Sequence, residues 1–170
     1  MARPQKVDGL EVGQDLEFQK KEWRAEMLGW ILMALLLLGA LAGLFGGGPI
    51  SQATAGGEAE ALTIDYHRFT RYQSPTQLLI TASPNAVSEG TVRLEIEQDY
   101  INSFNVQNVL PEPDSVEVMS DTYIYTFTVN EPNQGMEIIF DLESDKIGTI
   151  AGNLGVEGGQ NIRISHFVYP

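Results

Sequence analysis

Two histidines are the side chains in this sequence best suited to general-base or metal chemistry. His67 lies in an alternating polar and apolar segment, and His166 lies in a similar segment near the C-terminal end. Cysteine is absent, which excludes a disulfide framework, a thiol nucleophile and a thiolate metal site. No G-x-S-x-G sequence provides an activated serine, and no third ligand follows a spacing typical of zinc sites. We therefore expect each histidine to occupy a solvent-facing strand position, although adjacent first and last strands would allow a two-histidine site.

Three carboxylates spaced two residues apart, Asp141, Glu143 and Asp145, match the start of a calcium-binding loop. The pattern then fails, because Lys146 occupies the position that requires glycine and Gly152 stands where a bidentate glutamate is required. The sequence therefore predicts no catalytic residue, no cofactor and no metal site, and it predicts that the protein is not an enzyme. Acidic turns such as PEPD and NEPN leave calcium or glycan binding at the loops open as an alternative function.

Two tyrosines, Tyr123 and Tyr125, lie on the same side of one predicted strand. They would either pack in the core or form an exposed platform for a glycan or a protein partner. Core packing is the favoured prediction, because aromatic side chains are mostly buried.

The segments that hold these residues alternate with a period of two, as in TVRLEIE, QLLITA, TYIYTFTV and MEIIFDL. They are rich in β-branched and aromatic residues, and turn signals such as SPNA, PEPD, NEPNQG and EGGQN separate them. About seven short strands in residues 61–170 predict an antiparallel β-sandwich of immunoglobulin type, with a small barrel as the alternative. DYINSFNVQNV is expected to contain a short helical turn.

An apolar segment precedes this β domain. Residues 27–46 contain no charge, proline, asparagine or glutamine, and a helix of that length spans roughly 30 Å, the thickness of a bilayer's hydrocarbon core. We predict a transmembrane helix over residues 27–48. Five residues near its first end suit the membrane interface and the cytoplasmic side: Lys20, Lys21, Trp23, Arg24 and Trp30.

The next basic residue after the apolar segment is Arg68. By the positive-inside rule, residues 1–26 stay in the cytoplasm and the β domain is periplasmic or extracellular, which makes the protein single-pass in the inner (plasma) membrane. A cleaved secretory signal is the alternative, because Ala53-Thr54-Ala55 has the small-x-small form of a cleavage site. Against it, residues 1–26 carry six carboxylates and the apolar run is longer than a signal requires.

Three glycines, Gly39, Gly43 and Gly47, have the i, i+4, i+8 spacing that places small residues on one face of a helix. Small residues at this spacing let two helix backbones approach closely in lipid. They predict packing against another integral membrane protein or a second copy. The alternative is that the later glycines form an exit linker.

Charge is distributed unevenly along the chain. Residues 58–170 hold five basic and seventeen acidic groups, a net charge of −12, whereas residues 27–57 hold none. This balance argues against a nucleic-acid partner, because phosphates require a basic surface. Residues 49–60 are small and polar and are predicted to form a flexible linker before the β domain.

The sequence EGTVRLEIEQDYINSFNVQNVLPEPDSV, followed by YIYTFTV and GMEIIFDL, resembles bacterial extracytoplasmic Ig-like domains of membrane proteins. The layout EW…GW…GLFGGGP with a FVYP ending is also similar to short, single-span bacterial proteins of unassigned function. These resemblances imply architecture only. The function expected is a membrane-anchored interaction module, an accessory or assembly subunit of a larger membrane complex.

Overall fold

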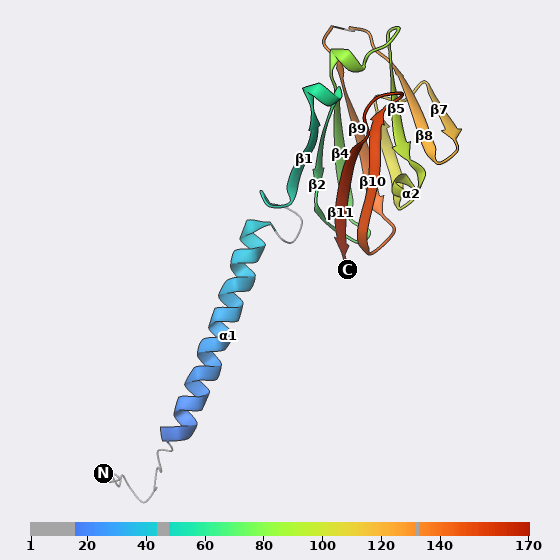
Figure 1. Cartoon of the computed structure of the whole chain (residues 1–170). Coiled ribbons are helices and arrows are strands. Elements are labelled where there is room, and N and C mark those ends of the chain that lie inside the picture. Colours follow the sequence, from blue (N-terminus) through green and yellow to red (C-terminus); the bar gives the residue numbers. More distant parts are fainter. Residues whose placement is uncertain (1–15, 44–47, 132) are drawn as a thin grey trace, which may run out of the picture. The chain divides into compact units, whose positions relative to one another are not determined.

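The structure, a computed structural model, describes residues 16–43, 48–131 and 133–170 (Figure 1). The chain divides into two compact units, residues 1–40 and 41–170. The first unit contains most of helix α1 (Leu16–Ala42), and the second contains the β-sandwich domain.

Helix α1 is apolar on every side over its C-terminal half, from Met27 onward. The most apolar 18-residue window within its segment Gln19–Ala42 has a mean hydropathy of 2.0, and no residue of that window is fully buried within the protein. It is the one helix within the described ranges that is long and apolar enough to cross a membrane.

The helix boundaries differ from the predicted residues 27–48. The helix begins earlier, at Leu16, because the sequence LEFQKKEWRAEM consists largely of good helix formers. It ends at Ala42, because Gly43 has a φ of +93°, a left-handed conformation that glycine adopts without steric cost. A Cβ added to Gly43 would also meet the backbone of Gly48.

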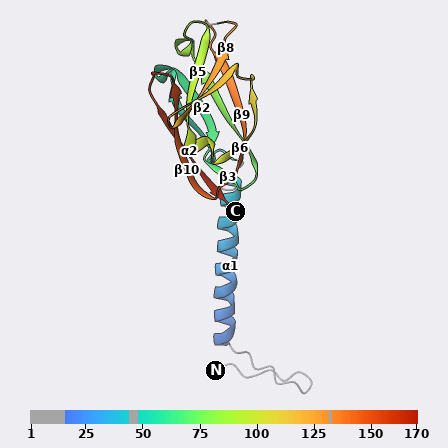
Figure 2. The same cartoon turned by 90° about the vertical axis from the view of Figure 1, so that its right-hand side faces the viewer.

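Eleven strands within the described residues form two packed sheets, which confirms the predicted β-sandwich although about seven strands were expected. Figures 1 and 2 show the two sheets. The first sheet contains, in spatial order, β1 (Gln52–Gly57), β2 (Leu62–His67), β4 (Pro75–Ala82), β9 (Met136–Ser144) and β6 (Phe104–Leu110). The second contains β3 (Phe69–Arg71), β11 (Ile162–Tyr169), β10 (Gly148–Val156), β5 (Thr91–Glu97), β8 (Thr122–Thr128) and β7 (Ser115–Met119).

All strand pairs are antiparallel except β3 with β11. Short 3-10 helices follow β1 (Glu58–Glu60) and β4 (Pro84–Ala86). The expected helical turn is α2 (Gln98–Ile101), between β5 and β6.

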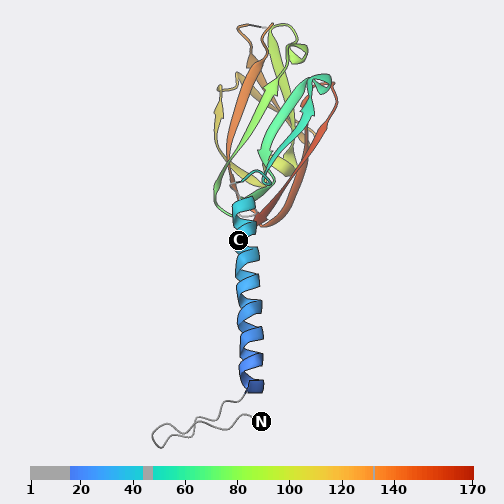
Figure 3. The ribbon, with the colours of Figure 1, turned by 90° about the vertical axis from the view of Figure 1, so that its left-hand side faces the viewer.

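The predicted flexible linker over residues 49–60 was wrong, because β1 lies within it. β1 pairs with β2 over six residues, from Gln52 opposite His67 to Gly57 opposite Leu62 (Figure 3). Just before β1, the backbone oxygen of Ser51 accepts a hydrogen bond from the Arg68 amide at 2.6 Å. The small residues that suggested flexibility instead suit an edge strand, where Ala53 is buried.

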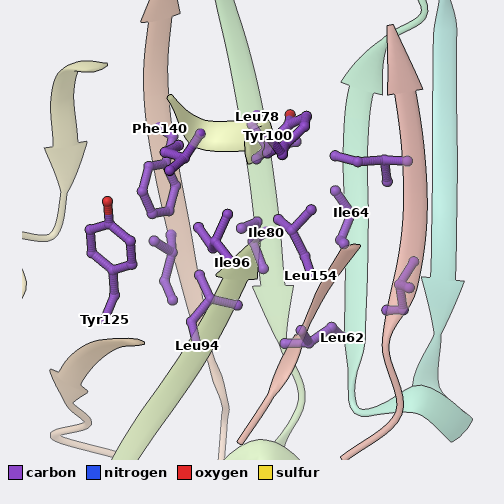
Figure 4. Packing of buried hydrophobic residues seen from close by; sticks show 14 of the residues in the cluster. Leu62, Ile64, Leu78, Ile80, Leu94, Ile96, Tyr100, Tyr125, Phe140 and Leu154 are labelled. Atoms are coloured by element: carbon purple, nitrogen blue, oxygen red, sulfur yellow. The ribbon is translucent and has the colours of Figure 1, made fainter. Parts of the chain in front are cut away.

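The core lies between the two sheets and is built from their alternating inward residues (Figure 4). β5 illustrates the pattern, because Val92, Leu94 and Ile96 are fully buried while the residues between them are not. Tyr125 lies at the margin of this cluster, beside Phe140, with the two rings edge to face at 5.3 Å.

Candidate functional site

The residues predicted to lie at the membrane interface are all on α1. Lys20, Lys21, Trp23, Arg24 and Trp30 are exposed, as are the leucines that follow them. The helix thus carries charges only in its N-terminal part and apolar side chains in the remainder, as a membrane-spanning helix would.

The predicted small-residue face does not extend over all three glycines. Gly39 is on α1 and half-buried, whereas Gly43 is the turn residue that follows the helix. Gly43 therefore cannot continue a helical face, and its φ of +93° gives it a different structural role as the helix terminator. Gly47 lies outside the described residues.

The prediction that His166 faces solvent was wrong. It lies on the inner side of β11 and is 1% exposed, between the rings of Tyr66, Tyr100 and Phe104. The backbone carbonyl of His67 lies 2.7 Å from His166 Nδ1, and the Tyr100 hydroxyl lies 2.8 Å from Nε2. Since a carbonyl only accepts, Nδ1 carries the proton, and Nε2 accepts from the tyrosine.

This arrangement holds a neutral imidazole. Burial lowers the pKa of His166 from 6.5 to about 4, and burial likewise raises the pKa of Tyr100 above its ordinary value. His67 contributes its backbone carbonyl, while its own ring is half-buried and lines the hollow described below. The structure therefore joins the two histidines through a core hydrogen bond that links the two sheets.

The carboxylates that resemble a calcium loop lie on a strand and the turn after it, not in a binding loop. Asp141 and Glu143 are on the outer side of β9, where they accept hydrogen bonds from Gln77 at 2.9 Å and Gln107 at 3.3 Å. Asp145 is exposed in the turn after β9. Across the described ranges, no group of three or more histidine, aspartate or glutamate residues is placed to hold a metal ion.

An open hollow of about 1050 Å³ lies where β3, β4, β9 and the end of β11 meet. Phe69, Arg71, Gln77, Gln107 and Asp141 contribute to its wall. Its lining is a mixture of cationic, anionic, amide and aromatic groups, without a dominant charge.

The most distinctive surface is at strand β7, at the edge of the second sheet (Figure 1). All five of its residues are exposed. Val116 pairs with Tyr125, which pairs with Leu94, so the three side chains share the core-facing side of the sheet. Their exposed fractions rise outward along this row, from 0% at Leu94 to 8% at Tyr125 and 47% at Val116.

A second row repeats the pattern. Ile96 is buried, Tyr123 is half-buried and Val118 is 65% exposed. The inner face of the second sheet thus continues past the area that the first sheet covers. We call the surface of Val116, Val118 and Tyr123, with the free backbone of β7, the β7 edge.

The sequence of β7 has the alternation of a strand, but turn-forming residues on both sides made it easy to miss. Turn-forming residues flank the strand at 111–114 (PEPD) and at 120–121 (SD), and no strand was predicted between them. The intervening SVEVM alternates with a period of two, as a strand does. For the two tyrosines, the structure supports core packing at Tyr125 and places Tyr123 at the margin of the exposed edge.

No family model and no curated protein matches this chain. Among solved structures, it is similar to the cohesin module of a family 33 glycoside hydrolase from Clostridium perfringens, at 12% sequence identity and a TM-score of 0.43. The alignment covers 68% of this chain and 98% of the cohesin module.

Proposed function

We propose that the protein is a non-enzymatic, membrane-anchored interaction module that serves as an accessory or assembly subunit of a larger membrane complex. Its anchor is α1, which crosses the inner membrane with the N-terminus in the cytoplasm. The exposed leucines of the helix and the basic residues at its start support this arrangement. The acidic sandwich is then outside the cytoplasm.

One observation carries the interaction role: at the β7 edge, apolar side chains are exposed beside a strand whose backbone is unpaired on one side. Exposed apolar surface next to free backbone groups is the usual feature of a protein-binding sheet edge. α1 supports a second contact, because Gly39 allows a neighbouring helix to approach its backbone within the membrane.

Co-purification from native membranes in mild detergent tests the role. A reproducible integral membrane partner is expected, and recovery of a solitary monomer would contradict the proposal. Chemical crosslinking before solubilisation serves as the control for complexes that the detergent dissociates.

The absence of cysteine permits a clean test of orientation. Asn130 is exposed in the sandwich domain, so Asn130→Cys should react with a membrane-impermeant maleimide on intact cells or spheroplasts. Ala2→Cys should react only after the membrane is permeabilised. The reverse pattern would place the sandwich in the cytoplasm.

A further inference from the structure

The backbone of β7 is free on one side. β7 pairs with β8, and a two-residue turn at Ser120 and Asp121 joins them, so Met119 and Thr122 form the pair that closes the hairpin. Hydrogen-bonded and non-hydrogen-bonded pairs alternate along an antiparallel ladder. Val116 and Val118 are therefore at non-hydrogen-bonded positions, with their amides and carbonyls directed away from β8.

The other three sheet edges each have a feature that opposes strand addition. β3 is three residues long, β6 has a register shift between Val106 and Asn108, and β1 ends in two glycines. β7 pairs with β8 in continuous register over its five residues and contains no proline or lysine. It is the edge best suited to receive another strand.

An added strand would cover the exposed valine side chains of β7. A strand paired with β7 would extend the second sheet and place its own side chains beside Val116 and Val118, on the core-facing side next to Tyr123. The added strand would then cover the exposed ends of the two apolar rows, which the first sheet leaves uncovered.

The charges around β7 indicate which kind of strand could pair with it. Residues 111–121 contain four acidic groups and no basic one, and all four are exposed: Glu112, Asp114, Glu117 and Asp121. Among the described residues, Arg93 is the basic group in contact with one of them, since it lies 3.5 Å from Glu117, and it also lies 2.9 Å from Glu157. Two copies joined through β7 would place these acidic groups against each other, and like charges oppose such pairing.

We infer that the β7 edge binds an extended segment of a partner protein in which apolar residues alternate with lysine or arginine. The segment pairs with the outward amides and carbonyls of Val116 and Val118, covers their side chains and neutralises the surrounding carboxylates. This inference rests on the proposed interaction role and specifies its partner.

The direct test uses the full chain in nanodiscs and a capped synthetic peptide of alternating lysine and valine. Two control peptides match it in length: one has glutamate in place of lysine, and one is N-methylated at alternate amides so that it cannot pair. Titration by fluorescence anisotropy should show binding of the first peptide alone, weakening with added salt. Hydrogen exchange at Val116 and Val118 should slow by about tenfold or more in the complex.

Val118→Pro removes one outward amide without removing a donor to β8, because proline is tolerated where an edge N–H faces solvent. It should weaken peptide binding by about tenfold, or ~1.4 kcal/mol. Val118→Thr is the matched control, since it keeps the amide and the β-branched shape, and it should bind within about threefold of wild type. Ile147→Thr is a second control, at an exposed apolar residue in the turn between β9 and β10.

Circular dichroism checks that Val118→Pro remains folded. If it does not, Val116→Lys with Val118→Lys replaces it, because two added cations should abolish binding of the basic peptide without altering the ladder.

Equal binding of the lysine and glutamate peptides would overturn the inference, as would unchanged binding by Val118→Pro. Self-association of the wild type that Val118→Pro removes would replace it with a second copy as the occupant. If Val118→Pro binds the lysine peptide as the wild type does and an integral partner still co-purifies with it, the inference fails while the proposed function stands. If no partner co-purifies with the wild type, the proposed function itself fails.

Discussion

Helix α1 and strand β7 both leave apolar side chains uncovered, but they do so in different ways. On α1 the apolar side chains surround the helix from Met27 onward, and the helical backbone satisfies its own hydrogen bonds. On β7 the apolar side chains lie on one side of the strand, carboxylates flank them, and one set of backbone groups is unpaired.

The difference indicates the solvent or partner that each surface requires. Hydrocarbon offers no hydrogen bonds, so it suits a helix without unsatisfied backbone groups. An open strand requires donors and acceptors as well as apolar contact, which another protein strand provides. Both segments expose apolar side chains, so exposed hydrophobicity alone does not distinguish them. They differ in whether their backbone amides and carbonyls are hydrogen-bonded.

The largest effect is expected from charging the centre of α1. Leu35→Lys with Leu36→Lys should prevent stable insertion, because each lysine at a helix centre costs about 3 kcal/mol on insertion scales. Leu35→Ile with Leu36→Ile is the matched control. The measurement is the fraction that stays with membranes after an alkaline carbonate wash. Equal fractions for the two variants would mean that lipid is not the environment of the helix.

The second-largest effect is expected at Leu94, which is at the buried end of the cross-strand row that ends at Val116. Leu94→Ala should destabilise the domain by about 2–5 kcal/mol, because it leaves a cavity in the core. Val116→Ala, on the same row at the β7 edge, should change stability by about 0.5 kcal/mol or less, as exposed substitutions do. Urea unfolding of the full chain in nanodiscs, followed by circular dichroism, measures both. Similar losses would show that Val116 is already covered.

A third prediction concerns pH. Since the pKa of His166 is about 4 in the folded protein and 6.5 when exposed, the unfolded chain binds more protons between these values. The contribution of neutral His166 to the free energy of unfolding should be fully present above pH 6.5 and should be lost as the pH is lowered toward 4. The total loss should be about 3 kcal/mol, at ~1.4 kcal/mol per pKa unit.

His166→Gln isolates this contribution, because protonation of the many carboxylates affects both proteins alike. The pH profile of the variant's melting temperature should lack the decline that His166 causes in the wild type. Parallel profiles would mean that His166 titrates normally.

Tyr100→Phe should lower stability by about 1–3 kcal/mol, since it leaves Nε2 of His166 buried without its donor.

The smallest effect is expected from the glycines of α1. Gly39→Ile should weaken helix association in lipid by about 1–2 kcal/mol, because it blocks close backbone approach. Gly29→Ile is the matched control, since Gly29 lies earlier on the same helix with no other group within 4 Å of an added Cβ. Energy transfer between labelled copies, or with the co-purified partner, measures association in liposomes. Equal losses from both substitutions would remove Gly39 as a packing position.

The features that sequence predicted correctly were those with an unambiguous period or composition. The run of leucines predicted one long apolar helix, and the alternation in segments such as TVRLEIE predicted half-buried strands. The sequence also placed a short helical turn where α2 lies. These signals are local, so they did not depend on knowing which segments pair.

What sequence missed depended on pairing. β1 consists of small residues with little β preference and is a strand because β2 provides a ladder for it. β7 lies between two turn signals, and no strand was predicted there. His166 was predicted to face solvent from its polar type, although it shares the period-two positions of Ile162, Ile164 and Val168, and this alternation places it on the buried side.

The position of β1 also decides where the domain can be excised from its anchor. A fragment that starts at residue 61, where the composition changes, would lack all of β1 together with the contact between Ser51 and Arg68. β2 would become a new open edge, and a freshly exposed edge promotes aggregation. A fragment that starts at residue 48 retains all six pairs between β1 and β2 and is the one expected to remain soluble.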